Sequence, residues 1–211
     1  MNEPESNRSS RTLAPDYFEG VYAASEDPWG FESRVYERSK YARTLAALPH
    51  AHYARGLEIG CSIGVLTRQL AARCTSLLAV DVNDTALQIA RRNGAAAGNV
   101  EWLRLQMPQE LPEGRFDLIM VSEVAYYWSV ADLTRMADWM VQRLNPGGAI
   151  VLVHWTDPVA DYPLRGDFVH AHFIDRALSG QLRRRYGEWH PRYRVDVFEP
   201  AGTEPPEDEA P

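Results

Sequence analysis

The chain has 211 residues, of which 45% are hydrophobic and 24% charged, and this composition predicts one globular domain with a full core. Its 22 basic and 29 acidic residues leave a net charge of -7, which argues against a nucleic-acid-binding surface. Two cysteines indicate neither a disulfide framework nor a metal site. No apolar run approaches the ~18 residues of a membrane span, and the polar start shows no secretory signal. We therefore expect a cytoplasmic protein without a membrane partner.

Strand and helix patterns alternate between two polar ends. Residues 1–14 and 199–211 are expected to be disordered, which leaves a single domain over 15–198. The first expected helix begins near Asp16, and others cover about 33–48, 64–73, 83–93, 130–144 and 167–178. The expected strands are 56–59, 76–80, 100–105, 116–121, 149–154 and 193–198. This alternation predicts an α/β fold in which helices cover both faces of a mostly parallel sheet.

The most informative segment follows the first expected strand and reads Leu57-Glu58-Ile59-Gly60-Cys61-Ser62-Ile63-Gly64. Its glycines allow the backbone to approach a ligand or the sheet closely. Asp81 ends the second strand 21 positions after Gly60, near the spacing at which a carboxylate can meet ribose hydroxyls. The pairing predicts a nucleotide-binding βαβ unit.

Three interpretations of this loop compete. The dinucleotide fingerprint G-x-G-x-x-G does not fit its spacing. Gly60-x-Ser62-x-Gly64 matches the nucleophile elbow of serine hydrolases, but that elbow follows several strands, whereas one strand can be placed before Ser62. The third pattern, E-x-G-x-[GS]-x-G with the acid at Glu58, resembles the first motif of Rossmann-like methyltransferases that use S-adenosylmethionine (SAM). An acid here suits a cofactor with an ammonium and a sulfonium group but no phosphate. Methyl transfer is the first choice, and a hydrolase or a dehydrogenase is the alternative.

Motifs outside the loop narrow the family. Over roughly residues 15–199 the chain resembles the nodulation protein S family, through Asp27-Pro28-Trp29-Gly30-Phe31, Tyr36-Glu37-Arg38-x-Lys40-Tyr41, the glycine loop, His154-Trp155-x-x-Pro158-Val159-x-Asp161-Tyr162-Pro163 and Tyr193-Arg194-Val195-Asp196-Val197-Phe198-Glu199. The resemblance implies a Rossmann-like three-layer sandwich with a mostly parallel seven-stranded sheet and a final antiparallel strand. It also implies SAM as the cofactor.

The resemblance indicates the methyl acceptor less directly than it indicates the cofactor. The name-giving member of the family N-methylates a deacetylated chitooligosaccharide, so the first choice is an amine nitrogen of an aminosugar or oligosaccharide. Methylation of a natural product at oxygen or nitrogen is the alternative, and a non-catalytic SAM-binding module is a third class. Ser122-Glu123-Val124-Ala125 replaces the Asn/Asp-Pro-Pro-aromatic turn of the DNA and glutamine N-methyltransferases, which favours a small molecule over nucleic acid. Monomer and homodimer both stay open.

The resemblance also assigns residues to the crevice at the carboxyl ends of the strands. The residues expected to bind the cofactor are Trp29, Tyr36, Lys40, Glu58, Gly60, Cys61, Ser62, Gly64, Asp81, Val82, Gln106, Met107, Ser122 and Glu123. Asp81 is expected on the ribose hydroxyls, with capping of the next helix as its alternative. Gln106 and Met107 are expected beside the adenine, and core packing is the alternative for Met107. No metal ligands are expected.

Segment 15–48 is expected to form a helical lid over this crevice. On a helix its Tyr36 and Lys40 share one face and could reach the SAM carboxylate, or could form an ordinary packed and solvated face. The first candidate base is His154, expected to face the crevice at the end of the fifth strand, with a structural histidine as the alternative. Glu123 is the second catalytic candidate, to bind an acceptor ammonium or take its proton. Stacking surface is expected from Tyr126, Tyr127, Trp128 and Trp155, and the run Arg183-Arg184-Arg185 is interpreted as a solvated face beside a strand.

Overall fold

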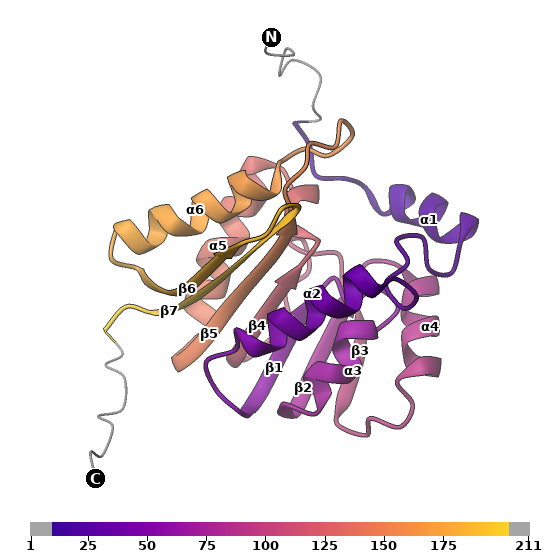
Figure 1. Ribbon diagram of the computed structural model, residues 1–211, viewed down its shortest axis with the longest axis horizontal. Helices are drawn as coiled ribbons and strands as arrows, with labels where there is room; N and C mark the ends of the chain where they lie inside the picture. Colours follow the sequence, from indigo (N-terminus) through magenta and orange to yellow (C-terminus); the bar gives the residue numbers. More distant parts are fainter. Residues whose placement is uncertain (1–9, 203–211) are drawn as a thin grey trace.

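The computed structural model describes residues 10–202, so the expected disorder of residues 1–9 and 203–211 lies outside the described residues. A seven-stranded sheet runs in the order β3-β2-β1-β4-β5-β7-β6 (Figure 1). Its strands are β1 Tyr53–Ile59, β2 Cys74–Asp81, β3 Val100–Arg104, β4 Phe116–Ser122, β5 Leu144–Trp155, β6 Leu182–Trp189 and β7 Tyr193–Pro200. β1 to β5 are parallel, while β7 is antiparallel to both β5 and β6. The predicted α/β class and the mostly parallel seven-stranded sheet are confirmed.

Helices cover both faces of the sheet. They are α1 Pro15–Ala24, α2 Val35–Ala46, α3 Val65–Ala71, α4 Asp84–Asn93, α5 Val130–Arg143 and α6 Gly166–Leu178, with a short 3-10 helix η1 at Ala125–Tyr127. α5 and α6 lie on one side of the sheet, and α2, α3 and α4 lie on the other (Figure 1). In β4, Ile119 and Val121 pack toward α5 and α6, whereas Leu118 and Met120 pack toward the opposite helices. Burial on both faces is why the central strands read as continuous apolar runs.

Two helix starts follow from capping side chains. Asn83 Oδ1 accepts the Ala86 N–H at 2.9 Å at the start of α4. Ser129 Oγ accepts the Asp132 N–H at 3.1 Å at the start of α5. Each cap satisfies one of the free N–H groups of a first helical turn, and both helices begin where the pattern predicts.

Three strands begin earlier than expected. β1 begins at Tyr53, β2 at Cys74 and β5 at Leu144. Residues Asn145-Pro146-Gly147-Gly148, which separate the expected helix 130–144 from the expected strand 149–154, lie inside β5, where the register with β4 shifts between the pairs Phe116–Leu144 and Leu118–Ala149. The extra residues of β5 bulge out between two paired segments, so helix-breaking residues are accommodated within one strand.

β6 is the strand that the sequence pattern does not predict. Its residues are mostly exposed or half-buried, because β6 forms the edge of the sheet and pairs only with β7. Without a buried face its sequence, Leu-Arg-Arg-Arg-Tyr-Gly-Glu-Trp, shows no alternation of apolar and polar residues. The sheet therefore ends in an antiparallel hairpin of β6 and β7 rather than in a single final strand.

The chain before α1 is held against the body of the protein. The hydroxyl of Thr12 donates to Asp132 Oδ2 and accepts the Ser129 N–H at 2.8 Å. The Leu13 N–H donates to the Tyr127 carbonyl at 2.9 Å. The expectation of disorder through residue 14 is therefore too long. Within residues 10–202 no helix has the length and apolar character to span a membrane.

Candidate functional site

A cavity of about 320 Å³ lies at the carboxyl ends of the central strands. The strand order reverses between β1 and β4, which is where ligands bind in open α/β sheets. The predicted cofactor residues that line it are Trp29, Lys40, Gly60, Ser62, Asp81, Val82, Gln106, Met107, Ser122 and Glu123. Glu58 and Cys61 line a small neighbouring cavity of about 20 Å³. Tyr36 and Gly64 line neither cavity.

The two glycines of the loop have different roles. Gly60 has φ +76°, and a Cβ there would lie 2.9 Å from Val124 Cβ, so glycine allows the loops after β1 and β4 to meet. Gly64 has φ +79°, and a Cβ there would lie 2.9 Å from the Trp102 ring. Gly64 therefore lets α3 pack closely beside β3, and it is not at the cavity surface. The Cys61 side chain is also buried, among Ala79 and Leu87.

Asp81 connects the loop to the cavity. Its Oδ2 accepts the Ser62 N–H at 2.8 Å and its Oδ1 accepts the Asn83 N–H at 2.9 Å. Burial raises the pKa of Asp81, and these backbone donors oppose the rise. Helix capping is done by Asn83, so that alternative for Asp81 fails. Each oxygen of a carboxylate can accept a further hydrogen bond, so a polar ligand at the cavity can still be bound.

Ser62 is not arranged as a hydrolase nucleophile. It has φ +50°, as an elbow residue would, but its hydroxyl is hydrogen-bonded to the Tyr22 hydroxyl at 2.5 Å. Among the described residues no histidine lines the cavity. A Ser-His-acid arrangement needs a histidine in contact with the serine, so the site gives the hydrolase interpretation no support.

Glu58 carries a strongly perturbed carboxyl group beside the loop. The residue is 2% exposed, and its Oε2 has no hydrogen-bond partner among residues 10–202. Burial raises the pKa of Glu58 to about 8, with a smaller rise from Asp81 and an opposing effect of the Thr67 hydroxyl. An unpartnered buried acid at the edge of a cavity is stabilised by a cationic ligand.

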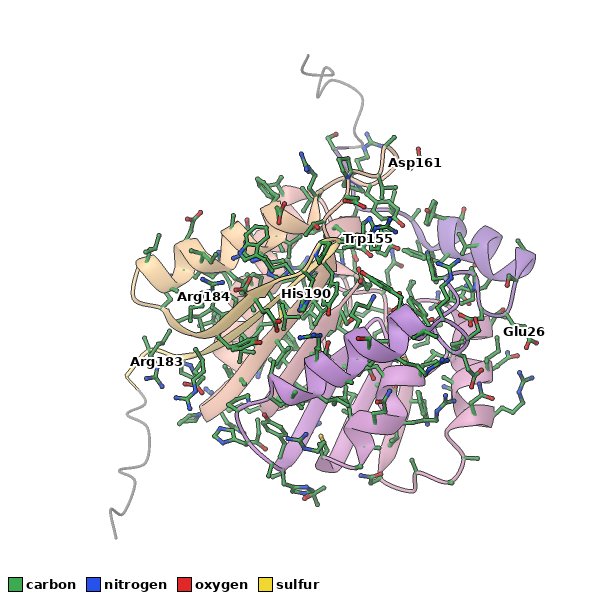
Figure 2. All side chains as sticks on the ribbon, viewed as in Figure 1. Glu26, Trp155, Asp161, Arg183, Arg184 and His190 are labelled. Atoms are coloured by element: carbon green, nitrogen blue, oxygen red, sulfur yellow. The ribbon has the colours of Figure 1, made fainter. Side chains whose placement is uncertain are left out.

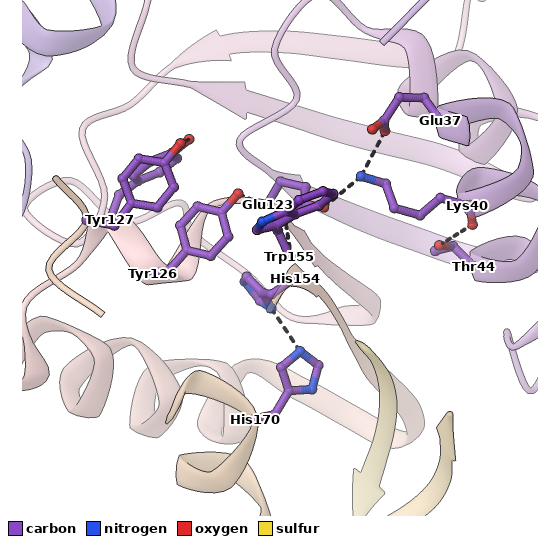
Figure 3. A network of polar contacts seen from close by, with 10 residues as sticks. Glu37, Lys40, Thr44, Glu123, Tyr126, Tyr127, His154, Trp155 and His170 are labelled. Atoms are coloured by element: carbon purple, nitrogen blue, oxygen red, sulfur yellow. Dashed lines mark hydrogen bonds and ion pairs between the residues drawn. The ribbon is translucent and has the colours of Figure 1, made fainter. Parts of the chain in front are cut away.

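A cluster of charged side chains from α2 and from the turn after β4 lies in the cavity wall. Lys40 Nζ lies 2.6 Å from Glu123 Oε1 and 2.8 Å from Glu37 Oε2 (Figure 3). Burial lowers the pKa of Lys40, but the two carboxylates outweigh burial and raise it. Lys40 is thus a stable cation between two acids, and with both acids ionised the cluster has a net charge of -1.

Tyr36 lies beside this cluster, with Lys40 Nζ 5.7 Å from its ring centroid, but lines neither cavity. Its ring makes edge contacts with Trp155 and Tyr193 at centroid distances of 6.0 and 5.9 Å. The expectation that Tyr36 points to the cofactor together with Lys40 is wrong for Tyr36, because its ring fills the junction between α2, β5 and β7.

Glu123 occupies a strained position at the end of β4. Its φ is +56°, which is uncommon for a residue with a side chain. Its Oε2 accepts the Tyr126 hydroxyl at 2.7 Å and the Trp155 N–H at 2.9 Å. Together with the Lys40 contact, these donors fix the carboxylate in the cavity wall.

Aromatic rings continue the wall beyond Glu123. Tyr126 stacks on Tyr162 with a centroid distance of 4.9 Å and an angle of 21°, and Tyr127 contacts Tyr162 edge-on at 4.7 Å. Phe18 and Leu13 complete this end of the cavity. The sequence indicated Tyr126 and Tyr127, whereas Leu13 and Phe18 lie before the motifs and give no signal of their own.

His154 does not face the cavity. It is fully buried, on the same sheet face as Ile150 and Leu152, so its ring points toward α6. Its Nε2 accepts the Ala125 N–H at 3.2 Å, and its Nδ1 lies 3.1 Å from His170 Nε2 (Figure 3). The expected orientation of His154 is wrong because side chains alternate along a strand, and the next residue, Trp155, lines the cavity instead.

The basic run does not form a free cationic surface. Arg183 and Arg184 lie toward the outer edge of the sheet, away from Trp155 and Asp161 (Figure 2). Arg183 pairs with Glu199 at 2.6 Å and Arg184 with Asp196 at 2.5 Å. These arginines pair with acids of the neighbouring strand β7.

This fold, with a glycine loop after β1, an acid ending β2 and a ligand-sized cavity at the switch point, is typical of the Rossmann-like methyltransferases. More specifically, the chain belongs to the nodulation protein S family. The family model described as "Nodulation protein S (NodS)" matches residues 20–161, more than half of the chain. The predicted family is confirmed.

Individual relatives agree with this assignment. The chain is 33% identical to nodulation protein S of Rhizobium tropici over 130 residues, which is 61% of this chain and 55% of that protein. It is 34% identical to a putative methyltransferase from Pseudomonas syringae of known structure, with a TM-score of 0.69 over 79% of this chain and 99% of that one. The N-methyltransferase NodS from Bradyrhizobium japonicum WM9, solved with S-adenosylhomocysteine, is 24% identical and shares the fold, with a TM-score of 0.77 over 88% of this chain and 97% of that one. The sequence matches span 55%, 60% and 62% of the nodulation S proteins of Rhizobium tropici, Sinorhizobium fredii and Bradyrhizobium diazoefficiens, less than two thirds of each.

Proposed function

We propose that this protein transfers the methyl group of SAM to an amine nitrogen of a small molecule, with an aminosugar or oligosaccharide amine as the first choice. The observation that carries the proposal is Glu123, whose carboxylate is held in the cavity wall between Lys40 and the aromatic residues. A carboxylate at this place can accept a hydrogen bond from an amine and orient it. A small-molecule partner, the absence of nucleic acid and a cytoplasmic location are part of the same prediction.

The residues around the glycine loop fit SAM. Gly60 allows a ligand to approach the backbone, Asp81 offers acceptor oxygens for ribose hydroxyls, and Glu58 has an unpartnered buried oxygen. The acids Glu37, Asp81 and Glu123 outnumber the bases Arg34 and Lys40 in the cavity wall, which suits a cofactor with a sulfonium cation. When bound, SAM supplies a methyl group that is already activated for displacement.

The protein's own contribution to the reaction is mainly positioning. Glu123 accepts one N–H of the neutral amine and so directs the lone pair toward the methyl group. After transfer the product ammonium has one proton to lose, which passes to Glu123 or to water. Tyr126, Tyr162 and Trp155 provide flat apolar surfaces for the acceptor and exclude water from the reacting atoms. His154 is too deeply buried to act as the base.

Segment 15–48 is proposed to act as the lid. It supplies Phe18, Tyr22, Trp29, Phe31 and Lys40 to the cavity wall, so it covers one side of the space in which the cofactor would lie. Trp29 stacks on Phe31 with a centroid distance of 5.4 Å. Both rings line the same cavity as the loop after β1.

A methyl-transfer assay tests the proposal. Isotopically labelled SAM is offered with glucosamine, with chitooligosaccharides that have a free amine, with their N-acetylated counterparts and with simple phenols. We expect label in the free amines and none in the N-acetylated compounds. Transfer to phenols alone would replace the proposal by its alternative, O-methylation of a natural product, and binding of NAD without SAM would refute the class.

The variant Glu123→Gln separates acceptor binding from cofactor binding. It loses the carboxylate charge but keeps the size, so the amine acceptor should show at least about tenfold lower kcat/KM. SAM affinity, measured by calorimetry, should fall by a smaller factor than kcat/KM, because Glu37 and Asp81 remain as acids in the cavity wall. Glu101→Gln is the matched control, because Glu101 is exposed on β3 and does not line the cavity.

A further inference from the structure

A chain of three buried polar side chains lies behind the cavity wall. His154 on β5, His170 on α6 and Asp196 on β7 are each 0% exposed. His154 Nδ1 lies 3.1 Å from His170 Nε2 (Figure 3), and His170 Nδ1 lies 2.5 Å from Asp196 Oδ2. At its other end the chain reaches the Ala125 N–H, which donates to His154 Nε2 at 3.2 Å. The chain therefore connects three elements of the core with the turn after β4.

The geometry permits one arrangement of protons in this chain. A backbone N–H can only donate, so His154 Nε2 must be the acceptor and the proton must be on Nδ1. His154 Nδ1 then donates to His170 Nε2, which leaves the proton of His170 on Nδ1, where it donates to Asp196. Each histidine has one proton and each contact has one donor, so all the bonds are satisfied at once.

Charge at the far end of the chain supports this arrangement. Burial raises the pKa of Asp196, but His170, Arg194 and Arg184 outweigh burial and lower it, so Asp196 is a carboxylate. Arg184 Nε donates to Asp196 Oδ1 at 2.6 Å, and Arg194 Nε lies 2.6 Å from Oδ2. Burial lowers the pKa of His154 and of His170, with Asp196 opposing the effect at His170. With Asp196 ionised and both histidines neutral, the donor and the acceptor of each hydrogen bond in the chain are fixed.

The turn after β4, at the other end of this chain of hydrogen bonds, carries Glu123, the residue proposed to bind the methyl acceptor. Glu123 has φ +56°, a backbone conformation that is uncommon for a residue with a side chain and persists only where neighbours enforce it. Strand β5 enforces it at three points. The Val153 carbonyl accepts the Glu123 N–H at 2.8 Å, the Trp155 N–H donates to Glu123 Oε2 at 2.9 Å, and His154 holds Ala125. Only the contact with His154 depends on where a side-chain proton lies.

The start of α6 is built to bring His170 to this place. A Cβ at Gly166 would lie 2.1 Å from the Trp155 carbonyl oxygen and 3.0 Å from His154 Cβ. Glycine at this position lets the first turn of α6 lie directly on the end of β5. His170 comes one turn later, at the distance needed to contact His154.

We propose that His154, His170 and Asp196 are positioning residues that hold the Glu123 carboxylate toward the acceptor. Asp196 sets the proton of His170, His170 sets the proton of His154, and His154 thereby keeps Nε2 free to accept the Ala125 N–H. The inference rests on the proposed function for the role of Glu123, whereas the arrangement of protons can be tested without any substrate.

Imidazole ¹⁵N NMR on the full-length protein tests the proton positions directly. We expect both histidines to be neutral with the proton on Nδ1 at pH 7, and the two Nδ1 signals to change in Asp196→Ala. A proton on Nε2 of His154, or a doubly protonated His154, would overturn the proposal, because neither form can accept the Ala125 N–H. This result does not depend on which acceptor the enzyme uses.

Paired variants test the consequence for catalysis. In His154→Gln the side-chain oxygen can still accept the Ala125 N–H, whereas His154→Leu has no acceptor. We expect kcat/KM for an amine acceptor to fall about 10- to 100-fold in His154→Leu and to recover to within about threefold of wild type in His154→Gln, with the Kd of SAM within about threefold in both. His172→Gln is the control on the same helix, because His172 contacts Arg176 instead of the chain. Equal losses in both variants, or a matching loss of SAM affinity, would show a merely structural role.

Two outcomes need separate treatment. If His154→Leu does not fold, the same comparison is made with His170→Leu and His170→Gln, since the glutamine oxygen can replace His170 Nε2 as the acceptor. If wild type methylates no amine, the proposed function fails, and the NMR result alone then decides whether the chain orients the turn. Recovery by glutamine with the expected NMR signals would establish the positioning role.

Discussion

Glu58 should make the stability of the ligand-free protein fall as pH rises. Its carboxyl group is 2% exposed, and burial raises its pKa from 4.5 to about 8. Because the folded state holds this proton more tightly than the unfolded state, the stabilising effect is complete below pH 4.5 and is lost progressively up to about pH 8. At about 1.4 kcal/mol per pH unit, the free energy of unfolding should fall by up to roughly 5 kcal/mol across that window from this group alone.

The variant Glu58→Gln isolates that contribution, since glutamine has the same size and never ionises. We expect variant and wild type to have similar free energies of unfolding near pH 5, and the variant to be more stable by a few kcal/mol at pH 8.5. Urea unfolding followed by tryptophan fluorescence at intervals from pH 5 to 8.5 measures the difference. Glu101→Gln on the exposed face of β3 is the control and should follow wild type at every pH.

Parallel curves for wild type and Glu58→Gln would refute the reasoning, because they would mean that Glu58 ionises in the fold without a penalty. A cation bound near the loop changes the expectation in a defined way. It favours the ionised carboxyl group, so SAM should bind more tightly as pH rises from 6 to 8 and should release a proton on binding. Calorimetry in buffers of different ionisation enthalpy measures that proton.

Three further substitutions test the site. Asp81→Asn should weaken SAM binding by about 2–3 kcal/mol, or roughly 30- to 150-fold by calorimetry. The control Asp84→Asn should have little effect, because the Asp84 side chain is 66% exposed. Equal SAM affinities of Asp81→Asn and wild type would limit Asp81 to holding the loop. Ser62→Ala should keep methyl transfer within about threefold, and an esterase activity that disappears in this variant would restore the hydrolase interpretation. Gly64→Ala should lower the free energy of unfolding by about 1–3 kcal/mol, because of φ +79° and the contact with Trp102. Gly98→Ala, with open space around its Cβ, is its control in urea unfolding, and equal stabilities would refute the packing role of Gly64.

The sequence predicts those parts of the fold whose signal is local. Buried parallel strands contain uninterrupted apolar runs, such as Leu118–Val121 in β4. Asn83 and Ser129 mark helix starts through side chains three residues from their partners. β6 gives no such signal, because an edge strand with exposed faces lacks a pattern and its arginines are paired with Glu199 and Asp196 on another strand.

The candidate site likewise has parts that the sequence predicts and parts that it does not. The glycine loop and Asp81 lie in one βαβ unit, so their spacing predicts their place. Lys40 and Glu123 are 83 positions apart, and spacing within α2 alone cannot show that they meet. His154 shows the opposite failure, since its place at the end of β5 is predictable but the face to which it points depends on the register of the strand.

The contacts of Glu123 favour an amine over a hydroxyl as the acceptor. A carboxylate offers about four lone-pair sites, and Lys40, the Tyr126 hydroxyl and the Trp155 N–H already use three. One site is left, enough to accept one hydrogen from a ligand. A neutral amine that donates this hydrogen still has its lone pair free to attack. A hydroxyl is a poor nucleophile until its only proton is removed, and the other acids in the wall, Glu37 and Asp81, are held by Lys40 and by backbone N–H groups. A cavity that orients well but offers little free base is suited to a nucleophile that needs orientation and no deprotonation before attack.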